Sequence, residues 1–270
     1  MSDPQGSAAG DKPRIVTLDI ETSPIESLHW KIWQEDIGLE QIQKEWSILS
    51  FSAKRLGSKE IIYHDTGGRG ASRVRDDSKV LRELWKVLDE ADIVVGQNSK
   101  RFDVKKIRAR MIMAGMKPFS PIRQVDTCEI ARRVFGFTSN RLAWLSKHLT
   151  KTVKSSHKEF PGFSLWQEVL LDNPRAWAQM KSYNIQDTIA TEELYLKLRP
   201  WAENQPNVGV YSESEAVVCP KCGSDKLQRR GTSVTQIGKF IRFQCQGCGG
   251  WSRSRQMING KEKRASLLAG

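Results

Sequence analysis

The stretch RIVTLDIET, residues 14–22, has the pattern of a β-strand that ends in two carboxylates. Aliphatic and β-branched residues dominate it, and Pro13 and Pro24 bound it, which predicts a strand. Because side chains alternate between the faces of a strand, Asp19 and Glu21 point the same way. Neighbouring carboxylates repel each other, and a shared divalent cation with oxygen ligands removes this repulsion. A solvent-facing strand end has the same short motif, so the rest of the chain decides between the two.

The composition describes a folded chain with an uneven positive charge. Its 270 residues are 39% hydrophobic, which allows one substantial domain and a small module. The net charge is +12, and residues 217–270 hold eleven Lys and Arg against two acidic residues. Such a concentration favours a polyanion partner, most simply nucleic acid, although a solubilising tail has the same charge.

No membrane association is expected. The sequence has no apolar run approaching the roughly 20 residues that span a bilayer, and residues 1–12 lack the pattern of a secretory signal. We therefore expect a cytoplasmic location, in the host cytoplasm if the chain is phage-encoded. Thiols stay reduced there, so paired cysteines are expected to bind metal rather than to form disulfides.

Strand-like segments come first and then alternate with helical ones. The predicted strands are residues 14–22, 48–54, 60–64, 93–96 and 121–126. The predicted helices are residues 77–90, 102–115, 127–135 and 142–149, and a long helix that begins at Pro174. This order predicts an α/β fold, a mixed sheet flanked by helices. Residues 29–46 contain three Trp and are expected to form a helix or a partly ordered excursion.

Changes in composition predict the domain boundaries. We expect a flexible leader, a main domain, a linker rich in turn-forming residues, a cysteine-containing module and a basic tail. These cover residues 1–12, 13–199, 200–216, 217–256 and 257–270 respectively.

Two more carboxylates occur where folding can bring them to the first strand. A buried strand ends at Gly96, and Asp103 opens the next helix, near the strand ends where ligands gather in α/β sheets. Asp103 has an equally good interpretation as a helix cap. Tyr183 and Asp187 are four residues apart on the long helix and share its core-facing stripe. A core Tyr with a solvent-facing Asp is the alternative.

Taken together, these motifs resemble a known family. D-I-E on the first strand, N-x3-F-D at a helix start and Y-x3-D on a late helix resemble the DEDD superfamily of 3′–5′ exonucleases. The resemblance covers residues 13–199 and implies a ribonuclease H-like fold. Its Tyr variant, DEDDy, occurs in the exonuclease domains of family B DNA polymerases and in stand-alone phage and bacterial nucleases. The His variant has its base where this chain has Ser182, so the Tyr variant is favoured.

The resemblance also implies roles for individual residues. The carboxylates Asp19, Glu21, Asp103 and Asp187 would hold two Mg²⁺ or Mn²⁺ ions, because hard cations take oxygen ligands. Tyr183 would orient the attacking water. The positions that it implies in substrate binding are Thr22, Asn98 and Phe102. Lys105 and Lys106 are expected to bind substrate for a different reason, because basic residues near Asp103 suit the phosphates of a polyanion. Of these, Asn98 is expected to fix the loop and Phe102 to pack against the helix. Asp126, which also ends a strand, is expected to cap the helix that follows.

Four cysteines form a second candidate metal site. Cys219-x2-Cys222 and Cys245-x2-Cys248 have the spacing of a structural, tetrahedral Zn²⁺ site, and the segment resembles a zinc ribbon. Basic and aromatic neighbours favour nucleic-acid binding, and docking of a replication or recombination protein is the alternative. The fifth cysteine, Cys128, is expected to be a buried apolar residue.

The sequence therefore predicts a metal-dependent 3′–5′ exonuclease that acts on single-stranded DNA or 3′ ends in replication, recombination or repair. Two alternatives remain open. The first is a 3′–5′ exoribonuclease, because discrimination depends on contacts to the 2′-hydroxyl that the sequence does not reveal. The second is a non-catalytic nucleic-acid-binding or docking protein that retains the fold.

Overall fold

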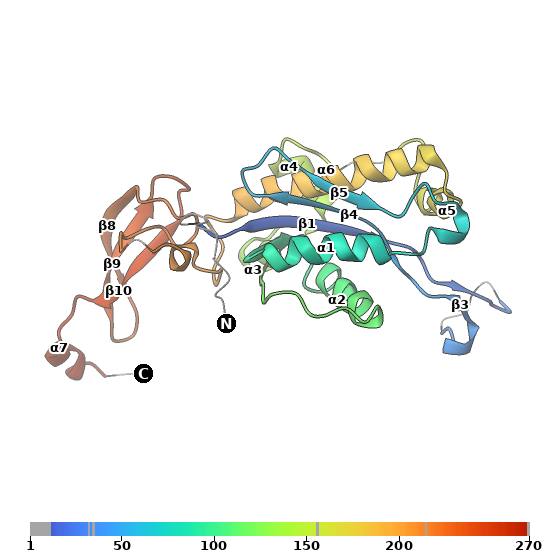
Figure 1. Cartoon of the computed structure of the whole chain (residues 1–270). Coiled ribbons are helices and arrows are strands. Elements are labelled where there is room, and N and C mark those ends of the chain that lie inside the picture. Colours follow the sequence, from blue (N-terminus) through green and yellow to red (C-terminus); the bar gives the residue numbers. More distant parts are fainter. Residues whose placement is uncertain (1–11, 32, 34–35, 155–156, 214, 269–270) are drawn as a thin grey trace, which may run out of the picture. The chain divides into compact units, whose positions relative to one another are not determined.

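The computed structural model describes residues 12–31, 33, 36–154, 157–213 and 215–268. The chain divides into two compact units, Arg14–Lys197 and a second unit that contains Leu198–Gly270 (Figure 1). No helix among the described residues has the length and apolar character needed to cross a membrane.

A five-stranded mixed sheet organises the first unit. Its strands lie in the order β5-β4-β1-β6-β7. β1 pairs antiparallel with β4, and β4 pairs antiparallel with β5, whereas β6 pairs parallel with both β1 and β7. These strands are β1 (Ile15–Thr22), β4 (Ile48–Arg55), β5 (Ile62–Asp65), β6 (Ile93–Gly96) and β7 (Arg123–Asp126). The sheet and its helices confirm the predicted ribonuclease H-like fold.

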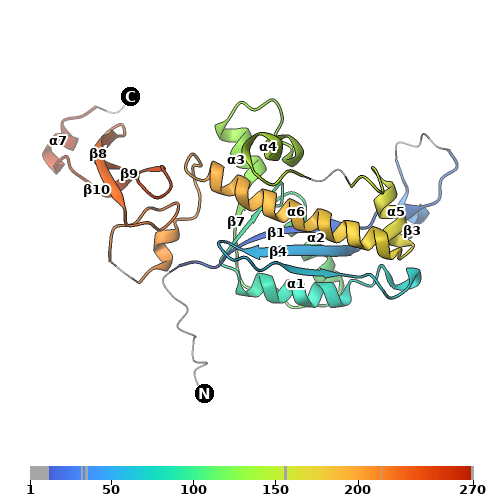
Figure 2. The same ribbon diagram turned by 90° about the horizontal axis from the view of Figure 1, so that it is seen from above.

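Helices cover both faces of this sheet. The helices α1 (Ser78–Glu90) and α2 (Asp103–Met113) lie on one face, and the long helix α6 (Pro174–Leu198) crosses the other (Figures 1 and 2). The shorter helices are α3 (Thr127–Val134), α4 (Leu142–Leu149) and α5 (Ser164–Leu170). The sequence patterns predicted all of these except α5, whose seven residues are too few to establish a helical period.

Two apolar clusters determine which side of β1 carries its polar residues. Val16, Leu18 and Ile20 pack in a cluster with α1 and α2. A second cluster joins α5 and α6 to Leu49 of β4. Because side chains alternate along a strand, burying Val16, Leu18 and Ile20 against α1 leaves Asp19 and Glu21 facing α6.

Residues 29–46 do not form the helix that was one of the two structures expected for them. Their described part contains only the 3₁₀ turn η1 (Leu39–Gln41) and the strand β3 (Ile42–Lys44), which pairs with β2 (Glu26–Ser27). Trp30 and Trp33 are 96% and 93% exposed. An amphipathic pattern stabilises a helix mainly through packing of its apolar face, and these two indoles have no such packing. A further 3₁₀ turn, η2 (Ala71–Arg73), lies between β5 and α1.

The second unit is built on a three-stranded antiparallel sheet. Its order is β10-β9-β8, formed by β8 (Leu227–Val234), β9 (Lys239–Cys245) and β10 (Trp251–Met257). The 3₁₀ turn η3 (Val208–Tyr211) precedes the sheet and the short helix α7 (Lys261–Ala265) follows it. This sheet, together with the cysteine cluster, confirms the predicted small C-terminal module.

Candidate functional site

Three carboxylates converge where β1 ends against α6. Asp19, Glu21 and Asp187 each offer an oxygen that lies within 4.8 Å of the oxygens offered by the other two. Asp19 and Glu21 are partly exposed, whereas Asp187 is only 2% exposed. Residues far apart in sequence therefore meet through the packing of one helix on one strand.

Asp103 joins this cluster from the first turn of α2. Its Oδ1 accepts a hydrogen bond from the backbone N–H of Ile20 at 3.1 Å, which attaches the helix start to β1 between Asp19 and Glu21. The carboxylate of Asp103 also raises the pKa of both of these residues. It is the largest contribution after burial for Asp19, whereas burial, Lys154 and Asp187 all contribute more for Glu21. The structure thus brings all four sequence-predicted carboxylates together.

Burial and mutual repulsion make these carboxylates poor anions in the absence of a cation. Burial is the main cause that raises the pKa of Asp19 well above its ordinary value, and the charges of Asp103 and Asp187 add to it. Burial likewise raises the pKa of Glu21 to about 8 and that of Asp103 to about 7. A bound cation reverses this effect because it stabilises the ionised form.

Tyr183 lies on the same face of α6 as Asp187, one turn earlier. It is 7% exposed, and burial, with further contributions from Glu21 and Asp187, raises its pKa. A phenol in this state keeps its proton at neutral pH, so it can donate or accept a hydrogen bond but does not act as a base.

Lys154 is a site residue to which the sequence patterns assign no role. Its Nζ forms an ion pair with Asp187 Oδ2 and lies 4.5 Å from the centroid of the Tyr183 ring. It also lowers the pKa of Glu21. This lysine lies between α4 and α5 outside any helix or strand, and an irregular segment has no period that indicates which of its side chains points into a site.

Asn184 orients Asp19 from within α6. This asparagine is fully buried, its Nδ2 donates to Asp19 Oδ2 at 2.6 Å, and its Oδ1 accepts from the Ser50 hydroxyl at 3.2 Å. A buried polar residue needs such partners. The presence of Asn184 among the apolar residues of the core-facing stripe of α6 is the signal in the sequence that indicates them.

The carboxylate cluster fits hard divalent cations. Its donors are all oxygens, and Oδ1 of Asp187 is buried without a hydrogen-bond partner among the described residues. A buried oxygen left in this way is costly unless an ion or water satisfies it. Mg²⁺ and Mn²⁺ favour carboxylate oxygens, whereas Zn²⁺ sites in proteins favour nitrogen and sulfur ligands.

The predicted substrate-binding residues lie at the ends of the same elements. Thr22 is the last residue of β1, and Asn98, with φ of 61°, occupies the left-handed region in the loop after β6. Lys106 Nζ lies 3.6 Å from the centroid of the Trp46 ring, and Lys105 is exposed on α2. The Phe102 side chain is 38% exposed, and the ammonium of Lys106 on α2 lies 5.9 Å from the centroid of its ring.

Asp126 organises the neighbouring loop. Its carboxylate accepts hydrogen bonds from the backbone N–H groups of Cys128 and Glu129, which confirms the predicted helix cap. It also accepts from the N–H groups of Asn98 and Lys100 at 2.9 and 3.2 Å. With its oxygens engaged in this way, Asp126 is a structural residue of the loop that contains Asn98.

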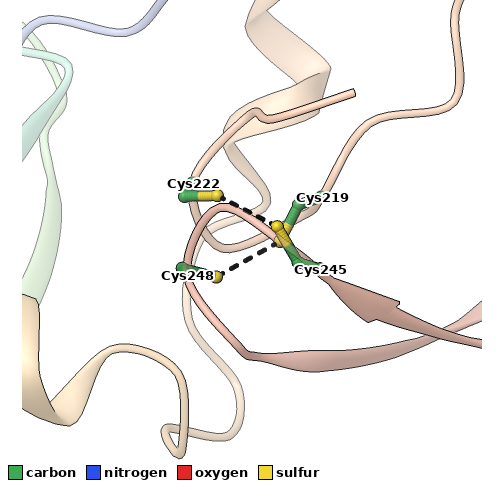
Figure 3. A group of neighbouring side chains, drawn as sticks. All are labelled: Cys219, Cys222, Cys245 and Cys248. Atoms are coloured by element: carbon green, nitrogen blue, oxygen red, sulfur yellow. Dashed lines mark hydrogen bonds between the residues drawn. The ribbon is translucent and has the colours of Figure 1, made fainter. Parts of the chain in front are cut away.

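The four cysteines of the second unit form a closed sulfur cluster. Their sulfurs point toward one another (Figure 3), with 3.8 Å between Cys219 and Cys248 and 3.6 Å between Cys222 and Cys245. Tetrahedral Zn²⁺ with Zn–S bonds of ~2.3 Å places sulfurs ~3.8 Å apart. Burial opposes ionisation of Cys245, but hydrogen bonds from the backbone N–H groups of Cys248 and Gly247 and from the thiols of Cys222 and Cys219 together outweigh it and lower its pKa to about 7. The cluster fits the predicted zinc ribbon.

Comparisons with known proteins address the first unit. A family model described as RNase_H superfamily matches residues 16–199. A search of the curated proteins found no match. The family B DNA polymerase of the hyperthermophilic archaeon Pyrobaculum calidifontis is similar in structure, with a TM-score of 0.53 and 14% identity. That match covers 76% of this chain but only 27% of the polymerase, and at this identity it concerns the fold alone.

Proposed function

The chain belongs to the RNase_H superfamily through residues 16–199, and from this premise we propose that it is a two-metal-dependent 3′–5′ exonuclease. One observation carries the proposal. Asp19, Glu21 and Asp187 converge within 4.8 Å, and Tyr183 precedes Asp187 by one helical turn. The family supports a nuclease, and this arrangement of residues supports the exonuclease branch with tyrosine.

The carboxylates Asp19, Glu21, Asp103 and Asp187 would hold the ions. When bound, two Mg²⁺ or Mn²⁺ ions would stabilise the negative charge on the attacking and leaving oxygens of an in-line displacement. In hydrolysis the oxygen of water bonds to phosphorus, the bond from phosphorus to the 3′ oxygen breaks, and a proton from the water ends on that oxygen. The products are a nucleoside 5′-monophosphate and a chain one nucleotide shorter.

Tyr183 and Lys154 then have distinct tasks. The raised pKa of Tyr183 keeps its hydroxyl protonated, so we assign it to orienting the attacking water by a hydrogen bond. The ammonium of Lys154 lies beside Asp187, and we assign it to the phosphate at the scissile bond, where it offsets negative charge. Asn184 acts indirectly, because it holds Asp19 in position.

We infer that the substrate is a single-stranded DNA end encountered in replication, recombination or repair. The exposed Phe102 directly precedes Asp103, and its backbone N–H donates to the carbonyl oxygen of the partly exposed Asn98 at 3.1 Å. These residues suit an unpaired end, because an exposed ring can stack on a base. RNA remains the alternative substrate, and the assay below separates the two.

The test is a time course on 5′-labelled single-stranded DNA and RNA of one sequence with Mg²⁺ or Mn²⁺. We expect a ladder that shortens from the 3′ end, absent in Asp19→Ala and retained in Glu60→Ala, a control that removes an exposed carboxylate away from the cluster. The faster substrate identifies the nucleic acid. Binding of both without cleavage would leave only a non-catalytic binding protein.

A further inference from the structure

One face of the three-stranded sheet in the second unit carries an exposed tryptophan among arginines. Trp251 of β10 pairs directly with Gln244 of β9, and Arg253 pairs directly with Arg242. Directly paired residues of antiparallel strands project from the same face. Arg230 of β8 reaches this face as well, because its Nη1 donates to Gln244 Oε1 at 2.6 Å.

The arginines on this face are held in place. The Arg242 guanidinium lies 4.9 Å from the centroid of the Trp251 ring, and the Arg230 guanidinium lies 5.8 Å from it. Arg242 Nε also donates to the carbonyl oxygen of Arg230 at 2.9 Å. The Arg253 guanidinium lies 3.8 Å from the centroid of the buried Phe240 ring. Trp251 itself stays 43% exposed, so much of its surface remains available to a ligand.

This arrangement is unfavourable for the isolated protein. Like charges directly opposite each other in a sheet are destabilising, and Arg242 and Arg253 occupy such a pair. Residues 217–270 contain only two acidic residues, Asp225 and Glu262. No salt bridge among the described residues involves an arginine of this face. A polyanion supplies the missing negative charge.

We propose that this face binds single-stranded nucleic acid, with an unpaired base stacked on Trp251 and phosphates held by Arg230, Arg242 and Arg253. Base–aromatic stacking needs a base that is not already paired within a duplex, and fixed guanidinium groups suit phosphate oxygens. The inference deepens the proposed function, since it assigns the zinc ribbon a role in holding the substrate of the nuclease. It is nevertheless measurable without cleavage.

The experiment measures binding of fluorescent single-stranded DNA and RNA to the full chain. All variants carry Asp19→Ala to prevent cleavage, and zinc content is measured to establish that the ribbon is folded. Trp251→Ala is expected to weaken binding about fivefold to tenfold, whereas Trp251→Phe, which still stacks, retains most of it. An abasic oligonucleotide of equal length should bind the Trp251→Ala and parent proteins equally.

A matched pair of arginine variants tests the electrostatic part. Arg242→Ala should weaken binding and reduce its salt dependence. Arg229→Ala removes the same charge from the opposite face, where Arg229 pairs with Phe243, and should have a smaller effect. Unchanged affinity in zinc-loaded Trp251→Ala and Arg242→Ala would overturn the inference, which is also the result expected if the face docks a protein. If the wild-type protein does not cleave nucleic acid but the variants show these binding effects, the proposed nuclease activity is refuted and the binding face is not.

Discussion

The two ligand clusters of this chain relate to the fold in opposite ways. The carboxylates Asp19, Glu21 and Asp187 come from elements far apart in sequence, which an extensive apolar core packs together. The four cysteines come from two short segments of a small module, one before β8 and one that includes the end of β9 and the turn to β10. Among the described residues of that unit only six apolar or cysteine side chains are buried, namely Leu198, Ala202, Val208, Cys219, Phe240 and Cys245.

This difference separates metals that perform chemistry from metals that make structure. In the first unit the core holds mutually repelling carboxylates together, and the raised pKa values of Asp19 and Glu21 reflect that repulsion and their burial. In the second unit the core is too small to fold alone without a further constraint. We therefore expect metal removal to leave the first unit folded and inactive, and to unfold the second.

Zinc removal should have the largest effect of all. Structural Zn²⁺ contributes about 10–16 kcal/mol of apparent binding energy in small zinc modules, which is as large as the stability of a typical domain. Chelation of Zn²⁺, or Cys222→Ser, should therefore remove the protection of β9 amides from hydrogen exchange, whereas amides of β1 and α6 should stay protected. Exchange measured by mass spectrometry checks both units in one sample.

Cys128→Ser is the control for loss of a thiol, because Cys128 is buried in the first unit and lies outside the sulfur cluster. It should leave the exchange of β9 unchanged. Protection of β9 that persists without zinc would show that the ribbon does not depend on its metal, and the contrast between the two units would then fail.

Glu21→Gln should have the next largest effect, on activity rather than on folding. Loss of a supporting outer-shell residue typically costs 10–100-fold in metal affinity or activity, so loss of a ligand should cost more than about 100-fold. The same change removes a repelled carboxylate, so the metal-free protein should become more stable at pH 8. Nuclease assays and thermal denaturation measure the two effects, with Glu60→Gln as control. A loss of stability would contradict the prediction.

Much of the carboxylate cluster and of the cysteine cluster could be predicted from local sequence patterns. The alternation in residues 14–22 predicts both the strand and the shared direction of Asp19 and Glu21, because strand periodicity is a property of the backbone. The four-residue spacing places Tyr183 on the same helix face as Asp187 for the same reason. The cysteine spacing indicates tetrahedral ligation without any knowledge of the fold.

Contacts that depend on loops could not be predicted in this way. Lys154 reaches Asp187 from an irregular segment, and nothing in its neighbours along the chain indicates that direction. The three Trp in residues 29–46 suggested an amphipathic helix, yet two of them are exposed beside a short hairpin. Periodicity predicts a helix only when an apolar face has something to pack against, and that information belongs to the tertiary structure.

Lys154→Met tests whether this loop residue belongs to the active site. The change keeps an apolar stem and removes the charge, so activity should fall about 10–100-fold, the usual cost of losing a supporting residue at a metal site. The affinity for Mn²⁺ should stay equal or increase, because the ammonium no longer competes for Asp187. Lys151→Met, an exposed lysine of the same loop, is the control. Unchanged activity would show that Lys154 only neutralises Asp187 in the absence of metal.

The pH dependence of stability should show the most specific effect. Burial, with the charges of Asp187 and Asp103, raises the pKa of Glu21 to about 8 in the folded state, whereas an unfolded glutamate titrates near pH ~4.3. Between these values the folded protein binds more protons than the unfolded one, so its free energy of unfolding falls as the pH rises. Added Mg²⁺ should reverse this fall at pH 8, because a bound cation stabilises the ionised carboxylates.

Urea denaturation of the zinc-loaded, Mg²⁺-free protein at several pH values measures this slope, followed through the aromatic signal of the first unit. Asp103, with a pKa of about 7, makes the free energy of unfolding fall with pH in both proteins. Subtracting the profile of Glu21→Gln therefore isolates the contribution of Glu21. A difference profile that is flat from pH 5 to 8 would mean that Glu21 titrates normally in the folded state. The core of the first unit would then not be holding mutually repelling carboxylates together, and this difference from the cysteine cluster of the second unit would disappear.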